Sequence, residues 1–302
     1  MNTKQGIIFG GIAVIALAIF GFSQFSTDQS PQTAAVVASQ TDIACVEGSL
    51  TASGSTALAP LAQKVAQQYQ KQCPDTRITI NLGGSGTGLT NVMNGVSDIA
   101  NSDIFSKPGQ EGLVDHQVAV VIFGLMVNDK VQVDSLTTEQ IKGIYAGTVT
   151  NWGQVGGNDL PIVVISRPPS SGTRATFQNY VLGGPETISG PSRLTSDSNG
   201  TVIKNVRQTA GAIGYAGTGP IKEAGLKTLK INDVEAIAAN VADGSYPYWN
   251  IEHMYTKGPA SALAQSFIDY VMSDASKPTL LTLDFVPISD ISPQILATHQ
   301  QQ

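Results

Sequence analysis

Residues 77–93 read Arg-Ile-Thr-Ile-Asn-Leu-Gly-Gly-Ser-Gly-Thr-Gly-Leu-Thr-Asn-Val-Met, and this stretch indicates the class of fold. Its first part, Arg77–Leu82, predicts a strand, and Leu89, Val92 and Met93 lie on one face of a predicted helix. A loop of glycine, serine and threonine joins the strand to the helix. The order strand, small-residue loop, helix is the repeating unit of α/β proteins.

The same unit recurs along the chain after residue 45. Helical spacing of apolar residues predicts helices, and apolar β-branched runs predict strands. The helix expected from residue 138 has Thr137 and Gln140 at the spacing of a capping box. The sequence therefore predicts an α/β protein with these elements: helix 57–72, strand 77–82, a helix containing 89–93, strand 98–103, strand 118–127, helix 138–146, strand 161–167, helix 174–182, helix 199–209, strand 212–215, strand 227–231, strand 246–255 and helix 260–273.

The length and composition exclude several classes of protein. The chain has 302 residues, which suits two domains or one large domain. Apolar residues make up 41% and charged residues only 13%, so a charge-rich disordered chain is excluded. The 17 Lys and Arg residues against 23 Asp and Glu residues give a net charge of -6, and no basic run occurs. We therefore expect no nucleic-acid partner.

Residues 1–45 are expected to form a leader ahead of the folded part. Lys4 precedes an unbroken apolar and small-residue stretch over 6–23, which is typical of a secretory signal or a signal anchor. The stretch is only just long enough to span a bilayer, so both interpretations stay open. The expected location is the periplasm or another extracytoplasmic space, with a membrane tether if the anchor is uncleaved. Cleavage points are expected after Ser23, Ala35 and Ala38.

Cys45 and Cys73 are the two cysteines of the chain. An even number of cysteines in an exported protein favours a disulfide, which here would close a loop. Two alternatives remain, a lipid anchor on Cys45 and a pair of buried free thiols. The first would require lipoprotein processing far beyond the apolar stretch. Two cysteines by themselves make no zinc site, and the scattered carboxylates have no metal-ligand spacing.

The loops around Ser53, Ser85 and Ser171 each place small hydroxyl residues at the start of a predicted helix. Free backbone N–H groups and the positive end of the helix dipole bind anions there without a basic residue. Each loop alone is equally explained as a helix N-cap. Together the loops predict an oxyanion site, in which glycine lets the backbone approach closely. Its expected groups are the hydroxyls of Ser55, Thr56, Ser85, Ser171 and Thr173, the glycines Gly86 and Gly172, and the guanidinium of Arg167.

Nucleotide binding and catalysis lack their usual sequence patterns. No Lys-Ser/Thr pair follows the glycine-rich loop at P-loop spacing, and Leu89 stands where a dinucleotide fingerprint needs glycine. Thr87 likewise stands where a nucleophile elbow needs glycine. None of His116, His253 and His299 adjoins a serine motif, and His299 falls in a polar tail. We therefore expect neither an enzyme nor a cofactor.

Five segments in order resemble the periplasmic phosphate-binding proteins of Pst-type ABC transporters, over about residues 47–290. The resemblance implies a two-lobe clamp of the type II periplasmic-binding-protein class, with two interlobe crossings. Lobe 1 would combine 46–126 and 217–295, and lobe 2 would contain 127–216. The five segments are Ala52-Ser-Gly-Ser-Thr-Ala-Leu-Ala-Pro60, Gly83-Gly-Ser-Gly-Thr-Gly88, Asn101-Ser-Asp103, Ser166-Arg-Pro-Pro-Ser-Ser-Gly-Thr-Arg174 and Gly211-Ala-Ile-Gly-Tyr215.

The resemblance also implies a set of phosphate ligands. Two departures from the family concern it: Ala57 stands where some members carry an aromatic residue, and Pro168-Pro169-Ser170 replaces a stretch that often holds an acidic partner of the arginine. Arg174 is a further candidate contact or an exposed helix residue. The implied ligands are Thr56, the backbone of Ala57, Ser85, Asp103, Arg167, Ser171, Gly172 and Thr173.

Asp103 is the most informative of these residues, because a carboxylate that faces an anion is otherwise unfavourable. A carboxylate accepts a hydrogen bond from a protonated phosphate and repels sulfate, which carries no proton. A turn or capping role is the alternative. We expect high-affinity binding of inorganic phosphate and its delivery, by a monomer, to the membrane permease of an ABC transporter. The alternatives are another tetrahedral oxyanion, a phosphate-ester hydrolase and a surface interaction module.

Overall fold

The computed structural model describes residues 45–300, which belong to one compact unit. The predicted signal or anchor segment at 6–23 lies outside the described residues. Within 45–300, no helix has both the length and the apolar character needed to cross a membrane.

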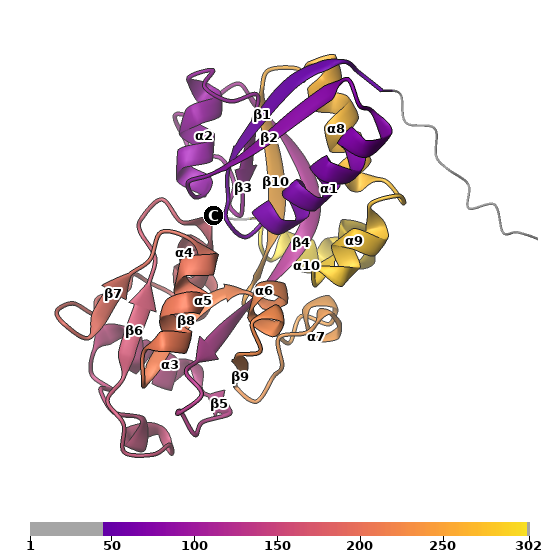
Figure 1. The fold of residues 1–302 in the computed structure, drawn as a ribbon. Coiled ribbons are helices and arrows are strands. Elements are labelled where there is room, and N and C mark those ends of the chain that lie inside the picture. The colour runs from indigo at the N-terminus through magenta and orange to yellow at the C-terminus, as the bar shows by residue number, and fades with distance from the viewer. Residues whose placement is uncertain (1–44, 301–302) are drawn as a thin grey trace, which may run out of the picture. The chain divides into compact units, whose positions relative to one another are not determined.

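The described chain alternates strands and helices, as the sequence predicts (Figure 1). The strands are β1 Gly48–Gly54, β2 Thr76–Leu82, β3 Ile99–Ser102, β4 Leu113–Val127, β5 Ser135–Leu136, β6 Val163–Ser166, β7 Arg193–Thr195, β8 Ala212–Gly217, β9 Lys227–Ile231, β10 Trp249–Lys257 and β11 Phe285–Val286. The helices are α1 Ala59–Gln72, α2 Ser85–Met93, α3 Thr138–Ala146, α4 Gly172–Phe177, α5 Asn199–Gln208, α6 Thr218–Glu223, α7 Ala238–Ala242, α8 Ala262–Met272, α9 Lys277–Thr282 and α10 Pro293–Ala297. Short helical turns are η1 Trp152–Val155, η2 Gln178–Leu182 and η3 Ile288–Asp290.

The strands pair in the order β2-β1-β3-β10-β4-β8-β6-β7, with β11, β9 and β5 joined beside β4. β1 is parallel to β2 and β3, and β6 is parallel to β7 and β8, so each set carries its helices in crossover connections. In such sheets the loops after the strands, at their carboxyl ends, are where ligands bind. The site residues predicted from the sequence lie in these loops.

β4 is the element shared by the two lobes of this α/β clamp. As far as Ile122 it pairs with β10 and β11, and from Phe123 onward it pairs with β8 and β9. Figure 1 shows β4 running from the elements around β1–β3 to those around β8 and β9. The interior of a strand covered on both faces is apolar, and 118–127 is buried throughout.

The pairing of β9 indicates where the chain crosses back from lobe 2 to lobe 1. This strand pairs with Leu125–Val127 of β4 and with β5, which belong to the second set of strands. β10 then returns to the first set by pairing with β3 and the earlier part of β4. The lobe boundaries 46–126, 127–216 and 217–295 stay a prediction, and this pairing favours a second crossing near Trp249 rather than directly after Tyr215.

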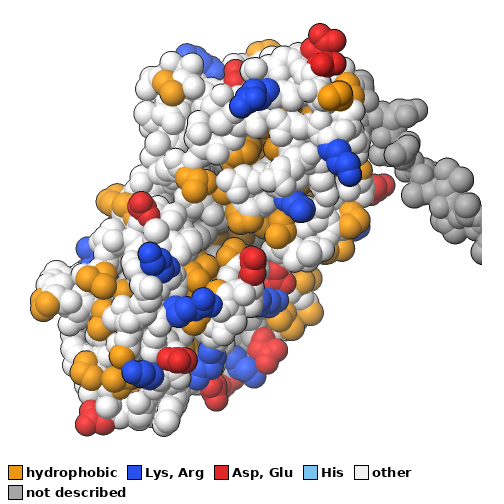
Figure 2. All heavy atoms as spheres, in the orientation of Figure 1, with side chains coloured by type: hydrophobic (Ala, Val, Ile, Leu, Met, Phe, Trp, Pro, Cys, Tyr) orange, Lys and Arg blue, Asp and Glu red, His pale blue; other side chains and the backbone are white. Residues whose placement is uncertain are grey.

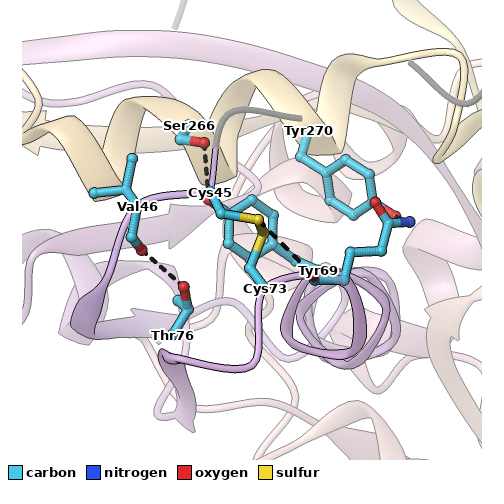
Figure 3. The surroundings of a disulfide bond; sticks show 8 residues. Cys45, Val46, Tyr69, Cys73, Thr76, Ser266 and Tyr270 are labelled. Atoms are coloured by element: carbon cyan, nitrogen blue, oxygen red, sulfur yellow. Dashed lines mark hydrogen bonds between the residues drawn. A yellow bond between two sulfur atoms is a disulfide. The ribbon is translucent and has the colours of Figure 1, made fainter. Parts of the chain in front are cut away.

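The predicted disulfide is confirmed, because Cys45 is bonded to Cys73 with their Cα atoms 5.4 Å apart (Figure 3). Cys73 ends α1, where its backbone N–H donates to the carbonyl of Tyr69 at 2.8 Å. Thr76 Oγ1 donates to the carbonyl of Val46 at 2.7 Å just beyond the bridge. The bond therefore fastens the start of the described chain to the end of α1, and the alternatives of free thiols and a lipidated Cys45 are wrong for this structure.

Two predicted helices can be compared directly with the structure, α3 and the helix expected over 174–182. Thr137 and Gln140 make both bonds of the predicted capping box. The helix expected over 174–182 consists of α4 followed by the π-helical turn η2, in which the hydrogen bonds change from one register to another. Its inner residue Phe177 is fully buried and stacks on Tyr215, with 4.6 Å between the ring centroids.

Candidate anion-binding site

The site is built where the loop before α1, the start of α2, the end of β3 and the loop before α4 contact one another. Gly86 N–H donates to the carbonyl of Ser170 at 3.0 Å, which joins the start of α2 to the loop before α4. The backbone N–H of Asp103 donates to Ser85 Oγ at 3.0 Å. Three serine-containing loops predicted separately from the sequence are thus brought together around Asp103.

Asp103 is the centre of this set of contacts and is only 2% exposed. Thr173 Oγ1 donates to its Oδ2 at 2.8 Å, and Ser55 Oγ donates to its Oδ1. Asn250 Nδ2 donates to its backbone carbonyl at 2.6 Å. The Asp103 carboxylate therefore accepts from a loop on each side of the site, and the hydroxyl of Thr173, predicted as an anion donor, serves this carboxylate here.

Arg167, the predicted cation of the site, is 1% exposed and is held by neutral acceptors. Nη1 donates to Asn199 Oδ1 at 2.7 Å, and Nη2 donates to Thr56 Oγ1 at 3.1 Å and to the carbonyl of Asp197 at 3.2 Å. Its buried Nε has no hydrogen-bond partner among residues 45–300. Burial lowers the pKa of Arg167, and the negative charge of Asp103 opposes that shift.

No carboxylate within the described chain lies within ion-pair distance of Arg167, in agreement with the departure noted at Pro168-Pro169-Ser170. A buried guanidinium with neutral partners is a costly arrangement unless an anion compensates it. Arg174 does have an acid: its Nε lies 3.5 Å from Oε2 of the buried Glu186. Glu186 also accepts from Tyr215 Oη at 2.5 Å, so Arg174 belongs to this neighbouring polar network.

The N-cap interpretation applies to one of the predicted ligands, Ser171. Its Oγ accepts from Arg174 N at 3.2 Å and so caps α4. Ala57 N–H donates to Ser55 Oγ at 3.0 Å, which makes Ser55 a hub that contacts both the start of α1 and Asp103. Ser85 opens α2 without a side-chain cap, since Gly84 precedes it at φ 85°.

Gly172 is required by the close packing of these loops. A Cβ atom there would lie 2.3 Å from Ser85 Oγ and 3.0 Å from Asp103 Cβ. No side chain fits at this position without displacing both residues. The backbone of α4 thus approaches Asp103 closely, as the sequence predicts from the glycine.

Asn199 is the contact that the sequence analysis missed. It opens α5, and besides accepting from Arg167 it donates its backbone N–H to Thr56 Oγ1 at 3.2 Å. Ser198 caps this helix with a complete capping box. The sequence Ser198-Asn199-Gly200 could have indicated this contact, because it is a fourth helix start with small polar residues, like the loops around Ser53, Ser85 and Ser171.

The face of the molecule drawn in Figure 2 carries charges of both signs. Figure 2 shows Lys and Arg side chains scattered singly over this face, with Asp and Glu among them. A net charge of -6 does not attract anions from a distance. We therefore expect affinity for an anion to depend on the buried groups of the site.

Known proteins similar to this chain include phosphate-binding proteins. The model of the PBP superfamily domain matches residues 33–275. The phosphate-binding protein PstS of Bacillus subtilis is 41% identical over 249 residues, which cover 81% of this chain and 82% of that protein. A putative phosphate ABC transporter substrate-binding protein from Clostridium perfringens, solved with bound phosphate, has a TM-score of 0.76 and 32% identity, covering 80% of this chain and 100% of that one. An ABC-type phosphate transport receptor from Vibrio cholerae has a TM-score of 0.64 and 27% identity, covering 78% and 99%.

Proposed function

The chain belongs to the PBP superfamily, and on that basis we propose that it binds inorganic phosphate between its lobes and delivers it to the membrane permease of an ABC transporter, outside the cytoplasm. The observation that carries the proposal is the pair Asp103 and Arg167, which are both buried and not paired with each other, and which bond the adjacent residues Ser55 and Thr56. A protonated oxyanion satisfies both groups, since it accepts from the guanidinium and donates to the carboxylate.

The remaining donors proposed for phosphate surround these two residues. They are the hydroxyls of Thr56 and Ser85, the backbone of Ala57, and the turn Ser171-Gly172-Thr173. Several of these donors are engaged within the protein here, as the bonds of Thr173 and Ala57 show. Phosphate binding would exchange those internal bonds for bonds to the ligand.

The proposal assigns no catalytic residue, no metal and no cofactor. The histidines contact other groups: His253 Nδ1 lies 2.8 Å from Asp115 Oδ1, and His116 Nε2 lies 3.5 Å from Thr256 Oγ1. Neither contacts Ser85 or Ser171, so neither histidine is placed as a general base for these two serines. The action proposed is binding and release by a monomer.

The test is a fluorescence titration of the purified protein with phosphate, sulfate and a phosphate monoester, using the buried Trp152 and Trp249 as reporters. We expect phosphate to bind far more tightly than the other two. Asp103→Asn keeps the shape and removes the acceptor charge, so the ratio of phosphate to sulfate affinity should fall by more than about tenfold, or about 1.4 kcal/mol.

Asp269→Asn, at an exposed position of α8, is the matched control and should leave the ratio unchanged. Equal binding of sulfate and phosphate by the wild type would contradict the proposal in favour of a general oxyanion-binding protein. A ratio that stays constant in Asp103→Asn would remove Asp103 from the recognition of the ligand proton.

A further inference from the structure

A second carboxyl group, Glu252 on β10, is buried near the anion site and has no role in the contacts described so far. Its side chain is fully buried, and neither carboxyl oxygen accepts a hydrogen bond from an N–H or hydroxyl donor among residues 45–300. An ionised carboxylate without a partner is strongly disfavoured in such a place, and binding a proton would remove that charge.

Strand register places Glu252 beside Asp103. β10 is antiparallel to β3, and the last pair is His253 with Ser102, so Glu252, the residue before His253, lies next to the end of β3, which Asp103 follows. Asn250 precedes Glu252 by two residues and therefore lies on the same face of the strand. Asn250 Nδ2 reaches the carbonyl of Asp103 at 2.6 Å and Thr176 Oγ1 at 3.1 Å, which shows that this face is turned toward α4 and the site.

The groups around Glu252 favour its neutral form. The residue opposite it on β4 is Ala119, and α4 contributes the hydroxyls of Thr173 and Thr176 to this region. The next residue of β10, His253, is paired with Asp115 of β4. Burial raises the pKa of Glu252 well above its ordinary value, and the negative charge of Asp103 and a hydrogen bond to its side chain raise it further.

We propose that Glu252 is a neutral carboxylic acid whose O–H stabilises and positions the Asp103 carboxylate when phosphate is bound. The inference rests on the proposed function. In this structure Ser55 and Thr173 donate to Asp103. When such a hydroxyl turns to a phosphate oxygen, Asp103 loses a donor, and the Glu252 O–H replaces it from the buried side. Glu252 acts through Asp103 and is a positioning residue.

The first arm of the test needs no ligand. The infrared spectrum of the wild type at neutral pH should contain the carbonyl stretch of a buried protonated carboxylic acid, and Glu252→Gln should lack that band. A wild-type spectrum without the band, or a band that persists in Glu252→Gln, would overturn the inference. Because no phosphate is present, this result is independent of the proposed function.

The second arm measures phosphate affinity by calorimetry. Glu252→Gln keeps the size and a donor, so its dissociation constant should stay within about threefold of wild type, whereas Glu252→Leu should bind at least tenfold more weakly. Met254→Leu, at another fully buried position of β10, controls for repacking of the strand. Wild-type affinity in Glu252→Leu would refute the positioning role. If the wild type itself binds no phosphate, the proposed function fails while the infrared result stands.

The two arms also separate a structural role from the proposed one. If Glu252→Leu unfolds, Glu252→Gln still tests the inference in two ways. Loss of the infrared band in this variant assigns the protonated acid to Glu252, and the pH dependence of its phosphate affinity tests the positioning role. Above the pKa of Glu252 the wild type should lose affinity relative to Glu252→Gln, because two negative carboxylates then face the anion. The ratio of the two affinities cancels the ionisation of phosphate itself. A Glu252→Gln variant that folds and binds at least tenfold more weakly would contradict the inference.

Discussion

The ring of His299, near the end of the described chain, leads to a prediction about stability and pH. It lies between Trp249 and Tyr180, with ring centroids 3.7 Å and 3.8 Å away, and its Nε2 is 3.3 Å from the carbonyl of Pro247. The residue is only 5% exposed. Burial lowers the pKa of His299 from 6.5 to about 4. The perturbation of interest is therefore acidification from pH 7.5 to pH 5.

The sign follows from the two pKa values. The folded state binds a proton less readily than the unfolded state, so the contribution of His299 is fully present above pH 6.5 and is lost as the pH falls toward 4. A pKa difference of this size corresponds to a loss of about 2 kcal/mol at pH 5 and about 3 kcal/mol at pH 4. For a protein of marginal stability this is a large part of the total.

Urea denaturation of wild type and His299→Phe across this range measures the effect. Phenylalanine keeps a ring between Trp249 and Tyr180 but cannot titrate, so carboxylates that titrate in both proteins cancel in the difference. The free energy of unfolding of wild type relative to His299→Phe should fall by about 2 kcal/mol between pH 7.5 and 5. His116→Gln, a partly exposed histidine of β4, is the control substitution. A constant difference between wild type and His299→Phe would refute the reasoning.

Two further predictions concern the site and the disulfide. Arg167→Ala should weaken phosphate binding by about 2 to 5 kcal/mol in a calorimetric titration, since it removes the buried charged partner of the ligand, and an unchanged dissociation constant would remove Arg167 from the site. Replacing both Cys45 and Cys73 by serine should lower the free energy of unfolding by about 2 to 4 kcal/mol without changing phosphate affinity, and equal urea midpoints for the variant and wild type would contradict this.

The sequence predicts the elements whose signals are local, whereas β1, β7, α6, α7, α9 and α10 were not among the predicted elements. The alternation of strand, small-residue loop and helix identifies β2 and α2, and the capping box marks the start of α3. The pairing of β9 cannot be predicted from nearby residues, because its partner strands, β4 and β5, are distant in the sequence. The predicted second crossing after Tyr215 came from the family resemblance, and only the pairing with β4 and β5 shows where β9 lies.

The candidate site was predictable where a residue type has a chemical role of its own. Arg167, Asp103 and the small hydroxyl residues stand out in the sequence. The structure places Arg167 against Thr56, and Asp103 against Ser55, Ser85 and Thr173. Glu252 and His299 did not stand out, because their properties come from burial. The expectation that His299 falls in a polar tail is wrong. His299 follows α10 and is buried, and its ring lies against the ring of Trp249. The composition of a terminal segment does not predict a tertiary contact of this kind.

The internal bonds of the site bear on how selectivity would arise under the proposed function. Here Arg167 has neutral acceptors and Asp103 has two hydroxyl donors. Any tetrahedral oxyanion can replace the acceptors of Arg167, so the guanidinium contributes affinity without distinguishing phosphate from sulfate. Recruiting both hydroxyls to the ligand takes two donors from Asp103. The Glu252 O–H proposed above replaces one of them for any ligand, and only a protonated ligand replaces the other. Sulfate would leave a buried carboxylate short of donors, a cost of about 1 to 3 kcal/mol or more. Selectivity therefore depends more on this penalty than on an additional contact to phosphate.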